Sequence, residues 1–290
     1  MNTRSIAAAM ADAGMTDAVQ AVSPLGGGCM HNVVAVNLSR GGHLVAKCAH
    51  AADADMLNTE SHSLEAIAAT GTVRVPDVHT VGVYLGTAIL LMEHLPGATA
   101  TARAWPLFGT SLASLHDCAA GQAYGYCSDN YLGRTPQRNT WCKDWVEFNV
   151  TCRLEPQLAL AIDSDLLQSG EKDVFESLIK HLGDILPHQP PPALLHGDLW
   201  SGNAVACGKE LAIIDPACSI GDRWCDIAMM RLFGGFPEEA FEAYEAATGQ
   251  RADSKRIAVY QTYHLLNHVN LFGRSYLAAA MGAARSALSC

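Results

Sequence analysis

The chain has 290 residues, of which 49% are hydrophobic and 17% are charged, a composition of globular rather than disordered proteins. Its 19 Lys and Arg stand against 29 Asp and Glu, a formal net charge of −10, and no basic stripe is interleaved with aromatic residues. Nucleic-acid binding is therefore not expected, because it depends on neutralising phosphates. A chain of this length forms one large domain or two lobes.

Neither a membrane span nor an export signal is expected from the sequence. No apolar run reaches the roughly 18 residues of a transmembrane helix, and Asp12 and Asp17 fall where a signal peptide would be apolar. The ten cysteines are scattered, without a Cys-x-x-Cys pair or a zinc-ligand spacing. His264 and His268 lie one helical turn apart, which we interpret as an ordinary helix face and not as half of a zinc site. We therefore expect a cytoplasmic protein with reduced thiols.

The first elements in chain order are a glycine-rich turn and a β-hairpin. The turn PLGGGCMHN contains Gly26, Gly27 and Gly28, and the strand-like runs VVAVNL and HLVAKCA follow it, joined by SRGG. Glycines allow the backbone to approach a phosphate closely, although a glycine cluster is often only a turn. Lys47 lies on the second strand, where an isolated Lys is commonly an exposed edge residue.

The segment ADMLNTESHSLEAIAA predicts a helix whose apolar face includes a carboxylate. At 100° per residue, one face comprises Met56, Leu57, Leu64 and Ile67. Glu60 falls within this arc, whereas Glu65 falls outside it. Because a carboxylate on a core-facing stripe must find a cation, we predict an ion pair between Lys47 and Glu60, with Glu65 exposed to solvent.

The segment TAILLMEHLPG predicts a buried strand that ends in a Pro-Gly boundary. We expect a first lobe over residues 1–94 and a second over 95–290. In the second lobe, the segments FGTSLASLHDC and DWVEFNVTCRLEPQLALAI predict helices, with an irregular stretch from Tyr124 to Thr140 between them. Its run QPPPALL, residues 189–195, cannot be helical and is expected to be extended.

The stretch LLHGDLWSGN, followed by AVACGKELAIIDPA, gathers oxygen ligands at one end of a hairpin. If Gly208-Lys209 is a two-residue turn, opposed positions place Asn203 opposite Ile214 and beside Asp215, with Asp198 in the loop that leads into the first strand. Amide and carboxylate oxygens suit Mg²⁺, and the remaining carboxylate could accept a hydroxyl proton. Each of these residues also has a local explanation, because Asp and Asn commonly cap turns.

The pattern His196-x-Asp198-x-x-x-x-Asn203, followed twelve residues later by Asp215, resembles the catalytic loop and metal-binding Asp of the protein-kinase-like superfamily. A finer resemblance is to the fructosamine kinase (ketosamine 3-kinase) family, from about residue 24 to 241. The segments that carry it are GGGCMHN, LLHGDLWSGN, IIDPACSIGDRWCDIAM, LFGGFP, GYCSDNYLGRTPQRNTW and DWVEFNVTCRLEPQL.

The resemblance implies an α+β bilobal fold, with a small antiparallel β-sheet lobe that contains one helix and a larger, mainly helical lobe. It implies that Lys47, oriented by Glu60, holds the phosphates of ATP under the loop of Gly26, Gly27 and Gly28. The hinge around Met92, Glu93 and Leu95 would hold adenine. The resemblance further implies that Asp198 is the catalytic base, that Asn203 and Asp215 bind Mg²⁺, and that His196 and Asp226 are structural supports.

The acceptor implied by the resemblance is the 3-hydroxyl of a fructosamine or related ketosamine, and phosphorylation there would release the amine. Trp200 would either lie against the sugar or anchor the loop. A polar stretch is a second candidate for the acceptor site: Asn130, Gln137, Asn139 and Trp141. Gly197 stands where typical protein kinases have Arg, and only eleven residues separate Asp215 from Asp226, which disfavours a regulated activation loop and a protein substrate.

Two other functions remain open from the sequence. The same scaffold phosphorylates aminoglycosides, choline and other small alcohols. A pseudokinase that binds nucleotide as an interaction module is disfavoured by the complete set of kinase residues. We also expect Cys29, in the glycine-rich turn, to be a site where oxidation blocks nucleotide binding. The sequence does not determine the oligomeric state.

Overall fold

The computed structural model describes residues 3–25, 32–118, 121, 123–251 and 253–289. It divides into two compact units, Met1–Ala104 with Gly202–Pro216, and Trp105–Ser201 with Ala217–Cys290. The expected division at residue 94 leaves out both the extension to Ala104 and the segment 202–216. Two backbone hydrogen bonds explain the difference, since the N–H of Ala98 donates to Ala206 and that of Thr101 to Gly208, both at 2.8 Å.

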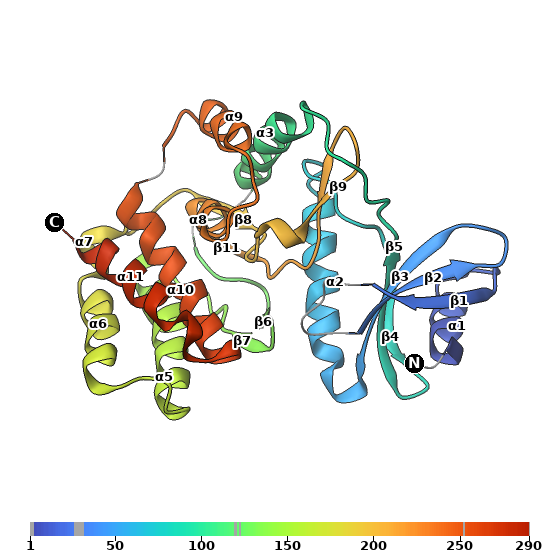
Figure 1. The fold of residues 1–290 in the computed structure, drawn as a ribbon, viewed down its shortest axis with the longest axis horizontal. Helices are drawn as coiled ribbons and strands as arrows, with labels where there is room; N and C mark the ends of the chain where they lie inside the picture. The colour runs from blue at the N-terminus through green and yellow to red at the C-terminus, as the bar shows by residue number, and fades with distance from the viewer. Residues whose placement is uncertain (1–2, 26–31, 119–120, 122, 252, 290) are drawn as a thin grey trace. The chain divides into compact units, whose positions relative to one another are not determined.

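The first unit is built on a five-stranded antiparallel sheet in the order β1-β2-β3-β5-β4 (Figure 1). Its elements are α1 (Thr3–Asp12), β1 (Val19–Pro24), β2 (Asn32–Leu38), β3 (His43–His50), the 3₁₀ turn η1 (Ala51–Asp53), α2 (Ala54–Ala68), β4 (Val78–Tyr84) and β5 (Thr87–Glu93). The predicted hairpin of β2 and β3 is confirmed, with Val33 opposite Lys47.

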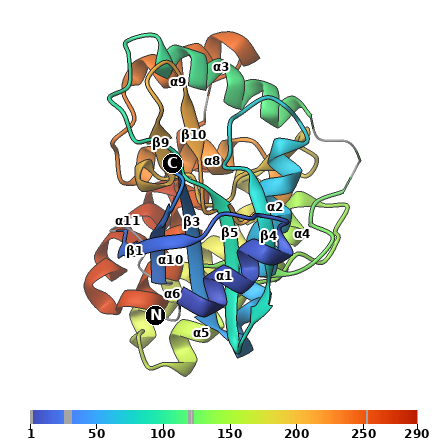
Figure 2. The same ribbon diagram turned by 90° about the vertical axis from the view of Figure 1, so that its right-hand side faces the viewer.

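The two helices of this unit cover opposite faces of the sheet (Figure 1). Helix α1 crosses one face (Figure 2) and packs Ile6 and Met10 against Ala46 and Cys48 of β3. Because successive strand residues point to opposite faces, Lys47 points to the other face, which α2 covers. The parity of β3 thus places the Lys47 side chain under the helix that carries Glu60.

The segment 202–216 adds a small hairpin to the first unit. It consists of the 3₁₀ turn η3 (Ser201–Asn203), β9 (Ala204–Ala206) and β10 (Leu211–Ile213). Ala206 pairs with Leu211 and the N–H of Ile214 donates to the carbonyl of Asn203 at 3.0 Å. The predicted register is therefore confirmed, and Asn203 lies beside the Ile214-Asp215 peptide.

The second unit is mainly helical. Its helices are α3 (Ala104–Asp117), α4 (Trp145–Asn149), the π-helix η2 (Val150–Leu154), α5 (Glu155–Asp163), α6 (Ser169–Lys180), α7 (Leu182–Ile185), α8 (Trp224–Leu232), α9 (Glu238–Thr248), α10 (Ser254–Phe272), the 3₁₀ turn η4 (Arg274–Tyr276) and α11 (Leu277–Leu288). Two antiparallel strand pairs complete it, β6 (Asn130–Leu132) with β7 (Thr135–Gln137), and β8 (Pro192–Leu195) with β11 (Ser219–Asp222).

One detail of the second unit corrects an expectation from sequence. The stretch from Tyr124 to Thr140 is not wholly irregular, because it contains the β6–β7 hairpin, which turns at Gly133 in a left-handed conformation with φ of 65°. Helix α8 begins at Trp224, and Asp226 lies within its first turn.

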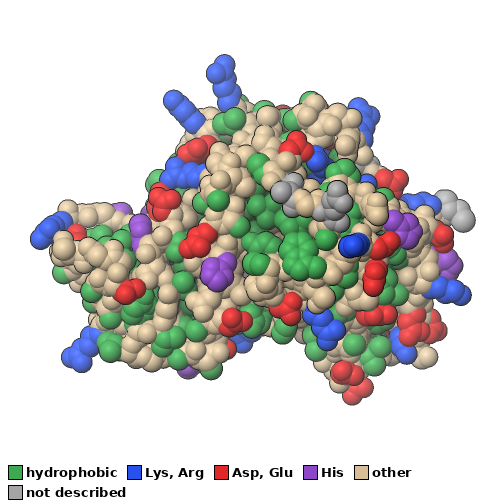
Figure 3. Space-filling view, turned by 180° about the vertical axis from the view of Figure 1, so that it is seen from behind, with side chains coloured by type: hydrophobic (Ala, Val, Ile, Leu, Met, Phe, Trp, Pro, Cys, Tyr) green, Lys and Arg blue, Asp and Glu red, His purple; other side chains and the backbone are tan. Residues whose placement is uncertain are grey.

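Two further features are the apolar length of the helices and the distribution of charge on the surface. No helix among the described residues is both long and apolar enough to cross a membrane. On the face shown in Figure 3, acidic and basic side chains are interspersed instead of gathering into one basic area.

Candidate active site

Lys47 is a buried cation that contacts two carboxylates. It is 5% exposed, and its Nζ lies 2.5 Å from Oε1 of Glu60 and 2.5 Å from Oδ1 of Asp215. The predicted pair with Glu60 is confirmed, and Glu65 is exposed as expected. The contact with Asp215 was not predicted, and it joins strand β3 to the segment that follows β10.

Charge and burial act in opposite directions in this cluster. Burial alone would lower the pKa of Lys47, but the charges of Glu60 and Asp215 outweigh it, and the net pKa is raised above the ordinary value for lysine. Burial raises the pKa of Glu60, against the influence of Lys47. Lys47 therefore stays charged at neutral pH. An ammonium has three donors, two of which go to these carboxylates, and the third can bind a phosphate oxygen.

Asp215 has a left-handed backbone conformation, which Leu85 and Asp165 also adopt. Its φ is 59°, a left-handed value that is unusual for a residue other than glycine, and Pro216 follows it. Only Oδ1 is used by Lys47. The Asn203 side chain is buried at the start of β9, beside the Ile214-Asp215 peptide. An amide oxygen and a carboxylate oxygen are a donor set that fits Mg²⁺, which also takes phosphate oxygens and waters.

In the second unit, a buried carboxylate holds the loop that carries Asp198. Asp226 is 1% exposed. Its Oδ2 accepts a hydrogen bond from the N–H of His196 at 2.7 Å, and its Oδ1 accepts one from Gly197 at 2.9 Å. The N–H of Asp198 in turn donates to Nδ1 of His196 at 3.2 Å. The contacts expected of His196 and Asp226 as loop supports are therefore present.

Gly197 is required by the packing of this loop. Its φ is 84°, and a Cβ at this position would lie 2.1 Å from the carbonyl oxygen of Ala217. The Ala217 N–H donates to the carbonyl of His196 at 2.8 Å. A side chain at position 197 therefore cannot be accommodated while the loop remains bound to both Asp226 and Ala217.

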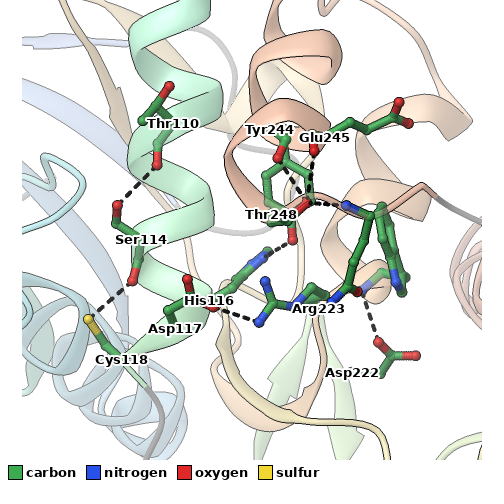
Figure 4. A network of polar contacts seen from close by, with 12 residues as sticks. Thr110, Ser114, His116, Asp117, Cys118, Asp222, Arg223, Tyr244, Glu245 and Thr248 are labelled. Carbon is green, nitrogen blue, oxygen red and sulfur yellow. Dashed lines mark hydrogen bonds and ion pairs between the residues drawn. The ribbon is translucent and has the colours of Figure 1, made fainter.

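Two residues that sequence reasoning missed support Asp226 from behind. His116 Nε2 lies 3.1 Å from Oδ2 of Asp226, and its Nδ1 lies 2.7 Å from the Tyr244 hydroxyl. Figure 4 shows His116, on α3, pointing toward Tyr244 on α9, with Arg223 and Asp117 paired alongside at 2.6 Å. Burial acts to raise the pKa of Asp226, but the interactions with His116 and the loop amides dominate and lower it. Asp226 is thus a carboxylate at neutral pH.

A cluster of rings in the second unit was also missed. Phe233, His268, Phe272 and Tyr276 form contacts with centroid separations between 5.0 and 5.9 Å. Phe233 is 40% and Phe272 48% exposed, so that the cluster presents ring surface to solvent. The loop after Phe233 packs against Ser201, since a Cβ at Gly235 would lie 2.4 Å from its Oγ, and the half-buried Trp200 is the preceding residue.

The hinge residues lie at the end of β5. Met92 is buried, the N–H of Glu93 donates to the carbonyl of Asp77 at 2.8 Å, and the Glu93 carboxylate pairs with Arg74 at 2.7 Å. Leu95 is half-buried and follows the strand. Adenine binding by this segment stays a prediction.

Other expectations are not supported or cannot be examined. Gly26, Gly27, Gly28 and Cys29 lie outside the described residues. The side chains of Asn130, Gln137 and Asn139 are buried and bonded within the protein, which does not fit a direct role in holding an acceptor. Trp141, in contrast, is 53% exposed.

The fold defines the class of protein. The chain superposes on the aminoglycoside phosphotransferase APH(4)-Ia, in a ternary complex with ADP and hygromycin B, with a TM-score of 0.64 at 14% identity, covering 97% of this chain and 98% of the other. At this identity the likeness concerns the fold alone, which is that of protein-kinase-like phosphotransferases. The bilobal α+β architecture expected from sequence is confirmed.

Within this class, the chain belongs to the fructosamine kinase family. The family model described as Fructosamine kinase matches residues 1–289. A Synechocystis protein assigned as a ketoamine kinase is 40% identical over 76% of this chain and 75% of its own length. The chloroplastic protein-ribulosamine 3-kinase of Arabidopsis thaliana is 34% identical over 92% of this chain and 82% of its own length. A Thermobifida fusca structure assigned as a fructosamine-3-kinase superposes with a TM-score of 0.89 at 31% identity, covering 99% of both chains.

Proposed function

We propose that this protein transfers the γ-phosphoryl group of ATP, with Mg²⁺, to the 3-hydroxyl of a ketosamine. The observation that carries the proposal is the contact of Lys47 with both Glu60 and Asp215, because it combines a phosphate-binding cation and a metal-binding carboxylate in one buried cluster. Family membership supports the sugar-amine acceptor, and the ADP complex of the aminoglycoside phosphotransferase supports the nucleotide.

In the first unit, the residues of the site hold the nucleotide. Lys47, kept charged and oriented by Glu60, donates to the phosphate oxygens. Asn203 and Asp215 would hold Mg²⁺, which neutralises charge on the phosphates when bound. Phosphoryl transfer depends mainly on such positioning and charge neutralisation.

In the second unit, Asp198 accepts the proton of the attacking hydroxyl. Its loop is held by the bonds from the backbone N–H groups of His196 and Gly197 to Asp226, which fix the backbone that carries Asp198. A base that is positioned before the substrate arrives loses no free energy in reorganising during the reaction. The acceptor sugar would lie against the half-buried Trp200, since flat apolar rings pack well against the C–H faces of a sugar.

The test is ATP consumption with Mg²⁺ on a panel of fructosamines, ribulosamines, aminoglycosides and choline. We expect turnover with ketosamines, a phosphate on the 3-hydroxyl by NMR, and loss of turnover in Asp198→Asn with ATP binding retained. Turnover confined to aminoglycosides or choline would overturn the acceptor. ATP binding without turnover on any acceptor would point to a pseudokinase.

A further inference from the structure

Arg153 is a buried cation in an unusual backbone. It lies in the π-helix η2 and is 6% exposed. The hydrogen bonds of its guanidinium to described residues go to uncharged oxygens, the carbonyls of Arg138 and Cys152 and the Oδ1 of Asn139 at 2.8 Å. The guanidinium also lies 4.5 Å from the centroid of the Phe148 ring. The Asp129 carboxylate, which accepts from the N–H of Asn139 at 2.7 Å, favours the charged guanidinium by its charge. Burying a charge without a directly bonded carboxylate is unfavourable, and π-helices are rare and concentrate at functional sites.

A chain of hydrogen bonds leads from Arg153 through the β6–β7 hairpin. Asn139 accepts from Arg153 and donates through Nδ2 to Oδ1 of Asn130 at 3.0 Å. Asn130 donates to the carbonyl of Cys218 at 2.8 Å. Gln137 donates to the same Asn130 oxygen at 2.8 Å and to the carbonyl of Ala217 at 3.4 Å. The interior of the hairpin is therefore bonded to two consecutive carbonyls, those of Ala217 and Cys218, in the segment that leads into β11.

Ala217 connects this hairpin to the catalytic loop. Its N–H donates to the carbonyl of His196, and its carbonyl packs so closely against Gly197 that no Cβ fits there. The loop is thus held at two points, by Asp226 through the N–H groups of His196 and Gly197, and by Ala217 through the His196 carbonyl. The β8–β11 ladder, in which Ser219 pairs with Leu195, holds the residues next to this second point. The bonds from Asn130 and Gln137 to the carbonyls of Cys218 and Ala217 hold the point itself.

We propose that Arg153 is a positioning residue for Asp198, acting through the β6–β7 hairpin and Ala217. Without the guanidinium, Asn139 and two carbonyls lose their donor, the hairpin relaxes, and Ala217 no longer fixes the loop. A displacement of about 1 Å at a reacting group can lower a rate by about 10²-fold. The inference rests on the proposed role of Asp198 as the base.

The first experiment measures kcat, the KM for ATP and Tm in Arg153→Met and Arg153→Lys. We expect Arg153→Met to lower kcat about 10²-fold while the KM for ATP stays within about two-fold, since the nucleotide residues belong to the first unit. Arg153→Lys should recover part of kcat, because an ammonium keeps the charge and some of the bonds but cannot form the planar fork. The control is Phe175→Leu on α6, a buried residue on a helix that packs against α5 and α11.

The second experiment follows amide hydrogen exchange in the full chain without substrate. In Arg153→Met, peptides that cover residues 196–200 and 217–218 should exchange at least ten-fold faster than in wild type, with no such change in Phe175→Leu. If Arg153→Met does not fold, Asn130→Ser tests the same connection from its far end, since it removes the bond to the Cys218 carbonyl and leaves Arg153 in place.

The inference is overturned if kcat of Arg153→Met stays within two-fold of wild type, or if Phe175→Leu loses as much kcat at the same Tm. It is also overturned if exchange in both peptides is unchanged. A wild-type protein that phosphorylates no ketosamine would count against the proposed function instead, and the exchange result would still decide whether Arg153 braces the loop.

Discussion

Asp215 accepts a hydrogen bond from Lys47 across 168 residues of sequence, with 2.5 Å between Nζ and Oδ1. This contact ties the segment 202–216 to the strand β3 inside one compact unit. The cation that we propose to bind phosphate and the carboxylate that we propose to bind Mg²⁺ are thus in contact in the protein without a nucleotide. Since Glu60 holds the same Nζ, each of the three side chains depends on the charge of the other two.

Replacing Lys47 should damage both activity and stability. In Lys47→Met, Glu60 and Asp215 lose the cation that they share, so we expect kcat/KM for ATP to fall at least ~10³-fold and the free energy of unfolding to fall by about 3 kcal/mol. Steady-state kinetics and urea unfolding measure the two effects. The control is Lys143→Met, which removes a lysine that is exposed.

The coupling within the cluster can be measured separately. Lys47→Met leaves the Glu60 carboxylate buried without its cation, and the double variant Lys47→Met/Glu60→Gln removes that carboxylate. Part of the lost stability should therefore return, while activity stays as low as in Lys47→Met. Strictly additive losses of the two single variants would contradict a shared charge cluster.

Asp215→Asn should change the Mg²⁺ concentration that activity requires. It should change the affinity for ATP without Mg²⁺ much less. It removes the charge of the proposed metal ligand, so we expect the Mg²⁺ concentration for half-maximal activity to rise at least ~10-fold. Titrations of activity and of ATP binding against Mg²⁺ measure this, with the exposed Glu65→Gln as control. An unchanged Mg²⁺ dependence would remove Asp215 from the metal site.

The parts of the site that the sequence predicted are those defined by local geometry. Lys47 and Glu60 could be paired because strand parity and helix periodicity each fix the direction of a side chain. The register of β9 and β10 followed from a two-residue turn, which placed Asn203 beside Asp215. Strand parity, helix periodicity and turn length all depend on residues that are close together in the sequence.

The parts that were missed depend on contacts between distant segments. The contact of Lys47 with Asp215 spans 168 residues, and that of His116 with Asp226 spans 110. Nothing in the pattern around His116 distinguishes it from an ordinary buried histidine. Gln137 was assigned to the acceptor site because it is polar, yet it is buried, since an interior hairpin strand needs side-chain donors for the carbonyls that it covers.

Asp226→Asn should destabilise the protein in a pH-dependent way. The pKa of Asp226 is lowered in the folded protein, so its stabilising contribution is present above the unfolded pKa of 3.8 and is lost as pH falls through the folded pKa. We expect wild type to exceed the variant by roughly 3 kcal/mol near pH 7, with the difference shrinking below pH 4. Urea unfolding over this range measures it. If the difference in free energy of unfolding between wild type and Asp226→Asn did not vary with pH, the shape of the side chain and not its charge would explain the destabilisation.

Gly197→Ala should disrupt the catalytic loop. The new Cβ would lie 2.1 Å from the Ala217 carbonyl oxygen, and the backbone φ of 84° is strained for alanine. We expect kcat to fall at least ~10²-fold and the free energy of unfolding to fall by roughly 2–4 kcal/mol. The matched control is Gly208→Ala in the β9–β10 turn, where φ is 77° but no atom lies within 4 Å of the new Cβ. That variant should lose only about 1 kcal/mol from backbone strain and keep its activity, because no carbonyl that holds the catalytic loop is displaced. Equal losses in the two variants would mean that strain, and not the contact with Ala217, explains why position 197 is glycine.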